Sequence, residues 1–77
     1  MLYDLYVKDI YHDERVHHGT HLPQEDVLSY LIGYAGFSQD AANMLIGAAD
    51  MFGSITYPAV TNTMHRVSVG RSKEKVS

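Results

Sequence analysis

A chain of 77 residues with six lysines and arginines, nine carboxylates and no cysteine carries a formal net charge of −3. At this length the chain can bury one small core, and the lack of cysteine excludes disulfides and thiolate metal sites as a further source of stability. No stretch approaches the roughly 20 apolar residues that cross a bilayer, and charges interrupt the first ten residues, unlike the apolar run of a signal peptide. We therefore expect a soluble, cytoplasmic protein with no membrane partner.

The charges are unevenly distributed along the chain. Residues 1–64 hold eight carboxylates against Lys8 and Arg15, a net charge of −6, whereas residues 65–77 hold four cations against Glu74, a net charge of +3. An acidic surface repels nucleic acid and attracts basic proteins. The charge pattern therefore favours a basic protein as the partner and disfavours nucleic acid.

The first predicted element is a strand over residues 2–11. Its apolar residues recur with a period of two on both faces, and it is rich in tyrosine and β-branched residues, a pattern typical of a central strand covered on both sides. The alternative is a strand that is covered on one side and open to a partner on the other. The polar run at 12–22 contains Gly19 and breaks this pattern, so it is predicted to be a loop. The alternative is a turn at 12–15 followed by a short strand at 16–21.

Two helices are predicted after this loop. The first begins at Pro23, since proline is preorganised for the first helical position and acidic residues follow in the first turn; it ends at Gly36. The second covers residues 38–52, with Ser38 as its N-cap and Gly53 as its end. The short connection between them makes the pair a helical hairpin.

The second helix is apolar on nearly all sides, whereas a surface helix keeps a broad polar face. A chain of this length has little material with which to surround such a helix, so we expect it to form the contact of a homodimer. Gly33 and Gly47 fall inside the two helical patterns, each at a cost of about 1 kcal/mol relative to alanine, and close approach of another helix is one compensation. The dimer residues predicted on the second helix are Met44, Ile46 and Met51.

The C-terminal part of the chain is predicted to form a strand hairpin. Two strand-like segments, SITYPAV and MHRVSVG, are separated by residues 61–63, and Pro58 confines the first of them to a sheet edge or a bulge because proline has no N–H to donate. The predicted fold is therefore α+β: a small antiparallel sheet, formed by the N-terminal strand and the C-terminal hairpin, covered by the helical hairpin. Residues 1–70 form this single domain, and residues 71–77 are a charged tail expected to be disordered.

Catalytic and metal-binding patterns are weak. Zinc takes imidazole and carboxylate ligands, but the histidines of the predicted loop have no specific zinc-motif spacing, so we expect solvated histidines, no metal and no cofactor. The chain lacks a cysteine nucleophile, a glycine-rich phosphate loop and a serine in a nucleophile elbow, and one small core rarely builds a catalytic cleft. We therefore predict that the protein is not an enzyme. The histidines and carboxylates of this loop are His12, His17, His18, His21, Asp13 and Glu14.

The helical pair allows an alternative function as a small helix-turn-helix-like DNA-binding regulator. Helix 38–52 would enter the major groove, and the basic C-terminal end would contact phosphates. That helix has no lysine or arginine, so this alternative is the less favoured one. The basic end contains Arg66, Arg71, Lys73 and Lys75.

An acidic, tyrosine-bearing surface is the favoured functional feature. The chain has six tyrosines, and tyrosine is enriched at interface hot spots; the alternative is that the tyrosines line the core with their hydroxyls at its rim. In size, acidity and lack of catalytic residues the chain resembles the small proteins carried by phages and other mobile elements, many of which bind and block a host nuclease or regulator. We therefore predict a non-enzymatic protein-binding inhibitor or adaptor whose target is a basic nucleic-acid-handling protein, such as a host nuclease. The predicted partner-binding residues are Asp13, Glu14, Glu25 and Asp26 for charge, with Tyr30 and Tyr34 as anchors.

Overall fold

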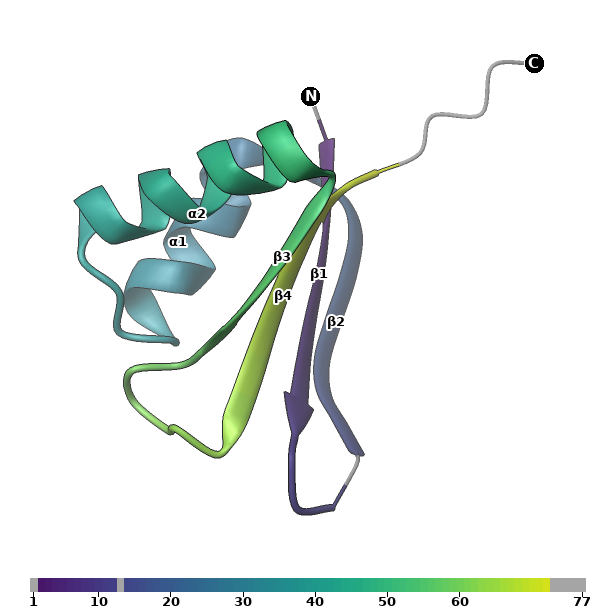
Figure 1. Ribbon diagram of the computed structural model, residues 1–77, viewed down its shortest axis with the longest axis vertical. Coiled ribbons are helices and arrows are strands. Elements are labelled where there is room, and N and C mark those ends of the chain that lie inside the picture. Colours follow the sequence, from purple (N-terminus) through teal and green to yellow (C-terminus); the bar gives the residue numbers. More distant parts are fainter. Residues whose placement is uncertain (1, 13, 73–77) are drawn as a thin grey trace.

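Four strands and two helices build the fold (Figure 1). The computed structural model describes residues 2–12 and 14–72. Within them the elements are, in chain order, β1 (Leu2–Asp9), β2 (Glu14–Pro23), α1 (Gln24–Gly33), α2 (Gln39–Phe52), β3 (Ser54–Pro58) and β4 (His65–Arg71).

The strands form one sheet in the order β2-β1-β4-β3, and every neighbouring pair is antiparallel. β1 and β4 pair in the centre, from Tyr3 opposite Arg71 to Asp9 opposite His65. α1 contacts β1 and β2, α2 contacts β3 and β4, and both helices cover the same face of the sheet (Figure 1). This arrangement confirms the predicted α+β class, with an antiparallel sheet covered by a helical hairpin.

The prediction of a loop at 12–22 is wrong, because Glu14–Pro23 forms β2 and pairs with β1. The register between the two strands shifts at two places. Close to one of these shifts, His21 takes a left-handed conformation with a φ of 54°. Such irregularities interrupt the alternation of side chains, so the sequence of β2 lacks the period-two signal of a strand.

The helix boundaries follow from local backbone geometry. α2 begins where the Ser38 hydroxyl accepts a hydrogen bond from the Ala41 N–H (3.1 Å), which confirms the predicted N-cap. It ends at Gly53, which has a positive φ of 91°. α1 ends at Gly33, earlier than predicted, and the positive φ of 82° at Gly36 instead turns the chain towards α2. Neither helix is long and apolar enough to cross a membrane.

The core lies between the sheet and the helices. Strand alternation turns every second residue of β1 and β4 towards the helices, and one side of each helix meets them. The Tyr3 side chain is 1% exposed, and its hydroxyl donates to the Asp50 carboxylate (2.9 Å), which ties β1 to α2. The buried residues of these four elements are Tyr3, Leu5, Val7, Val27, Leu31, Ala42, Leu45, Ile46, Ala49, Val67 and Val69.

The first residues of the predicted tail belong to the sheet. Arg71 ends β4, and the Ser72 N–H donates to the Leu2 carbonyl (3.0 Å). The predicted boundary after residue 70 therefore lies too early. The rest of the predicted tail, residues 73–77, lies outside the described residues.

Candidate functional site

The acidic residues predicted to bind a partner do not form one cluster. Glu14 begins β2, whereas Glu25 and Asp26 lie in the first turn of α1, directly after the other end of β2. β2 runs alongside β1 from Pro23 opposite Leu2 to Glu14 opposite Asp9, a length of about 23 Å at ~3.3 Å per residue, so the length of β2 separates Glu14 from the other two. Asp13 lies outside the described residues.

The two tyrosines predicted as anchors lie at the C-terminal end of α1. The ring of Tyr30 stacks on that of Tyr34 at a centroid distance of 4.7 Å, and the Tyr34 ring lies parallel to that of His65 at 6.5 Å. Tyr30 packs against the core, and its burial, followed by the charge of Tyr34 and a hydrogen bond with it, raises the pKa of Tyr30. Tyr34 is 43% exposed, so it is the ring of this pair that offers surface to a partner.

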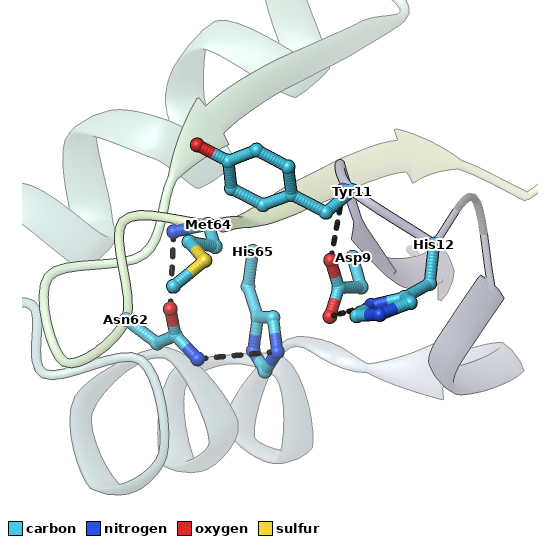
Figure 2. A network of polar contacts seen from close by, with 6 residues as sticks. All are labelled: Asp9, Tyr11, His12, Asn62, Met64 and His65. Atoms are coloured by element: carbon cyan, nitrogen blue, oxygen red, sulfur yellow. Dashed lines mark hydrogen bonds and ion pairs between the residues drawn. The ribbon is translucent and has the colours of Figure 1, made fainter.

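Local hydrogen bonds order the turns at the ends of the two strand hairpins (Figure 2). The Asp9 carboxylate accepts from the Tyr11 N–H (2.9 Å) and lies 3.2 Å from His12 Nδ1. These contacts lower the pKa of Asp9, and the Tyr11 N–H contributes most. In the other turn, Asn62 Oδ1 accepts from the Met64 N–H (3.0 Å). The polar side chains of both turns thus bind neighbouring residues and fix the turns.

The histidines predicted to lie together in a loop are spread along the β1–β2 hairpin. The His18 ring stacks on Tyr6 at a centroid distance of 4.7 Å, and the His21 N–H donates to the Asp4 carboxylate (3.3 Å). Among the side chains that the structure describes, those of residues 2–12, 14–16 and 18–72, no three from histidine, aspartate or glutamate come together as a group that could hold a metal ion. Proximity in the sequence is lost here because neighbouring residues of a strand face opposite sides of the sheet.

The outer side of the helices is acidic and carries exposed apolar side chains. α1 and α2 contain four carboxylates and no lysine or arginine. Three large apolar side chains of α2 are 74% or 75% exposed. Three of the carboxylates are exposed, whereas the Asp50 carboxylate accepts from the buried Tyr3 hydroxyl. We call the exposed residues the helical surface: Glu25, Asp26, Asp40, Met44, Met51 and Phe52.

An apolar groove lies beside α2. It has a volume of ≈ 290 Å³ and is lined by residues of α2 and β3 and by Phe37. Met44 lines the groove and is one of the predicted dimer residues. Met51, another predicted dimer residue, does not line the groove but is 75% exposed. Ile46, the third of these, is 3% exposed and packs in the core of its own chain. The groove residues are Phe37, Ala41, Met44, Leu45, Ala48, Ile55 and Tyr57.

The face of the sheet away from the helices is a second candidate surface, which the sequence indicated only as the alternative for the strand at residues 2–11. Its residues alternate with the buried ones, and cross-strand pairing brings them together. The alternation of side chains along a strand could have predicted that Lys8 and Tyr6 lie on the same side of β1. It could not have predicted that Arg15 and His18 join them on this face, because both lie in the segment predicted as a loop. We call this surface the open face: Asp4, Tyr6, Lys8, Arg15, His18, Thr56, Arg66 and Ser68.

No protein-family model matches the chain, and neither a curated protein nor a solved structure matches it.

Proposed function

We propose that the protein is a non-enzymatic inhibitor or adaptor that binds a basic nucleic-acid-handling protein, such as a nuclease, through the helical surface. The observation that supports this proposal is the combination, on two adjacent helices, of three exposed carboxylates, no cation and three exposed apolar side chains. Carboxylates gathered on one surface attract a basic partner and speed its association. Large apolar side chains supply the buried contacts at the centre of an interface.

The groove beside α2 offers a place for one apolar side chain of the partner. At ≈ 290 Å³ it lies at the lower limit of about 300 Å³ for ligand pockets, which suits a side chain better than a cofactor. Met44 lines the groove, and Asp40 lies one helical turn before it on the same side of α2. A lysine or arginine that pairs with Asp40 therefore brings neighbouring apolar residues of the partner to the groove.

The residues that support this proposal differ in part from the predicted ones. Glu25 and Asp26 belong to the helical surface, whereas Glu14 lies at the far end of β2. In the proposed surface, Asp40 supplies the charge that Glu14 was predicted to supply, and Met44 supplies an apolar contact beside it.

The predicted homodimer would use the same helix. An α2–α2 contact between two copies would place the exposed Asp40 of both chains in one interface, and α2 has no cation to offset this negative charge. A basic partner is therefore the better occupant, and the homodimer stays a prediction. Light scattering at high protein concentration tests it, because a mass of 8.6 kDa corresponds to one chain.

The DNA-binding alternative also depends on α2. A helix in the major groove meets phosphates on both sides, and α2 carries two aspartates and no cation. The alternative stays a prediction, and sequence-selective binding to duplex DNA in a gel shift would favour it over the protein partner.

Affinity capture with matched variants tests the proposal. The tagged chain is used to capture proteins from a bacterial lysate, and the bound proteins are quantified by mass spectrometry. We expect Asp40→Lys and Met44→Ser each to reduce capture of a basic nucleic-acid-handling protein on the order of tenfold, the loss typical of a central interface residue. Met64→Ser is the control, since Met64 is 47% exposed but lies in the β3–β4 turn.

Two results would contradict the proposal. One is equal recovery of the captured protein by Met44→Ser and by Met64→Ser. The other is a captured protein without a basic surface. Calorimetry with the purified partner gives the affinity directly, and binding should weaken as salt screens the carboxylates of the helical surface.

A further inference from the structure

A row of three cations crosses the open face of the sheet. Lys8 on β1 lies opposite Arg15 on β2 and opposite Arg66 on β4. Neighbouring strands lie about 4.8 Å apart, so the backbone positions of all three fall within about 10 Å. The guanidinium of Arg66 donates to the Thr63 carbonyl (2.7 Å) and has further N–H groups to offer. Like charges directly opposite one another repel, so the row concentrates positive charge on one part of the sheet.

The next row across the same face offers rings and hydroxyls. Tyr6 lies opposite His18 and Ser68, and the rings of Tyr6 and His18 stack at a centroid distance of 4.7 Å. The guanidinium carbon of Arg15 lies 5.0 Å from the centroid of the Tyr6 ring. Ser68 Oγ lies 2.8 Å from Thr56 Oγ1 on β3. Flat groups and hydroxyls therefore lie directly beside the cations.

The carboxylates of the described strand residues lie away from the cation row on the open face. Among the described strand residues of the open face, Asp4 is the one carboxylate, and it lies about 13 Å from Lys8 along β1. It accepts a hydrogen bond from the Ser72 hydroxyl (2.6 Å). Asp9 and Glu14 lie opposite each other on β1 and β2, and alternation turns both to the helix side of the sheet.

We infer that the open face is a binding site for single-stranded nucleic acid, with Lys8, Arg15 and Arg66 contacting phosphates and the row of Tyr6 and His18 contacting bases. A single strand presents phosphates and unpaired flat bases together, which matches cations and rings on adjacent rows. An acidic peptide would engage the cations and leave the rings unused. A duplex requires a helix or a narrow ribbon that enters its groove, and the centre of a sheet offers neither.

The net negative charge of the chain does not oppose this site, because the charges are segregated. The open face carries three cations against one carboxylate, whereas α1 and α2 carry four carboxylates and no cation. The helices lie on the other side of the sheet (Figure 1), and salt at about 0.1 M screens charges beyond about 10 Å. The negative charge that repels nucleic acid therefore lies on the helical surface and not on the open face.

Fluorescence anisotropy with the full chain tests the inference. A labelled oligo-dT of about 20 nucleotides exceeds the site size of small single-strand binding domains and is titrated between about 50 and 200 mM salt. Each phosphate contact to a single strand contributes about −0.7 to the slope of log K against log salt, so three contacts predict a slope of about −2. We expect Arg15→Gln and Arg66→Gln each to bring the slope to about −1.4 and to weaken binding several-fold, roughly five- to tenfold, at the lower salt.

Arg71→Gln is the matched control. Arg71 is an exposed cation of the same sheet, but it lies opposite Tyr3 and therefore on the helix side. Its substitution removes the same charge from the chain and should leave the slope at about −2. Circular dichroism checks that each variant is folded.

Four results would overturn the inference. The first is no salt-dependent binding by the wild-type chain, and the second is an equal loss of affinity in Arg71→Gln. The third is tighter binding to a duplex of the same length. The fourth is equal competition by polyglutamate, which would assign the cation row to acidic chains in general.

Discussion

Gly47 gives a direct test of how the outer side of α2 is used. It lies in the interior of α2, and no atom from outside its own stretch of helix lies within 4 Å of the position that an alanine Cβ would occupy. Alanine is favoured over glycine in a helix interior by about 0.8–1 kcal/mol, because glycine loses more backbone freedom on folding. Since no contact within the chain opposes the added methyl group, we expect Gly47→Ala to raise the free energy of unfolding by about 1 kcal/mol.

Urea unfolding measures this change. For a small domain the denaturant dependence is about 1 kcal/mol per molar urea, so the unfolding midpoint should rise by about 1 M. The melting temperature should rise by about 4–8 °C. Gly36→Ala is the opposite control, because Gly36 has a φ of 82° and its added Cβ would lie 2.7 Å from Thr61 Cγ2; we expect it to destabilise the chain by at least about 1 kcal/mol.

A Gly47→Ala midpoint that stays unchanged or falls would refute this reasoning. It would mean that another chain packs on Gly47 closely enough for a methyl group to interfere, as in the predicted homodimer. The dependence of the wild-type midpoint on protein concentration separates the two cases, because a dimer is stabilised by mass action and a monomer is not.

Two further predictions concern the N-cap of α2 and the buried tyrosines. Ser38→Ala removes the acceptor of the Ala41 N–H and should lower the free energy of unfolding by about 1 kcal/mol, measured as a lower urea midpoint; an unchanged midpoint would show that water replaces the cap. Burial is the main cause that raises the pKa of Tyr3 and of Tyr30, so the neutral phenols are favoured in the folded chain. Their contribution to stability should be complete below about pH 10, the pKa of an unfolded tyrosine, and be lost as the pH rises above it. Urea midpoints at about pH 9 and 11 should therefore differ less in Tyr30→Phe than in the wild-type chain, and an equal difference would contradict the assignment.

The helices and the C-terminal hairpin were predictable because their signals are local. The hydroxyl of Ser38, the positive φ of Gly53 and the missing N–H of Pro58 each act within a few residues. Pro58 indeed lies on β3, which is an edge strand of the sheet. Signals of this kind need no knowledge of the partner element.

β2 was not predictable in the same way, because its pairing with β1 is irregular. Two register shifts interrupt its alternation, and His21 adopts a conformation that is rare outside glycine. The position of this strand is determined by its backbone pairing with β1 and not by the pattern of its own side chains.

The outer side of α2 could be predicted in part. The sequence shows a helix that is apolar nearly all round, but the choice between its inner and outer residues depends on where the sheet lies. Ile46 faces the sheet and Met44 and Met51 face outwards, although all three are apolar. Burial against a partner element, which the periodicity of one helix cannot show, decides between them.

The two proposed surfaces can be tested separately, because they lie on opposite faces of the sheet and share no residue. Substitutions at distant sites with no common partner act independently. Arg15→Gln should therefore weaken oligonucleotide binding and leave capture of the basic protein unchanged, whereas Met44→Ser should do the reverse. If both hold, the chain can bind a nucleic-acid-handling protein on one face and a single strand on the other at the same time. A loss of both activities in either variant would instead mean that protein and nucleic acid reach the chain through one surface.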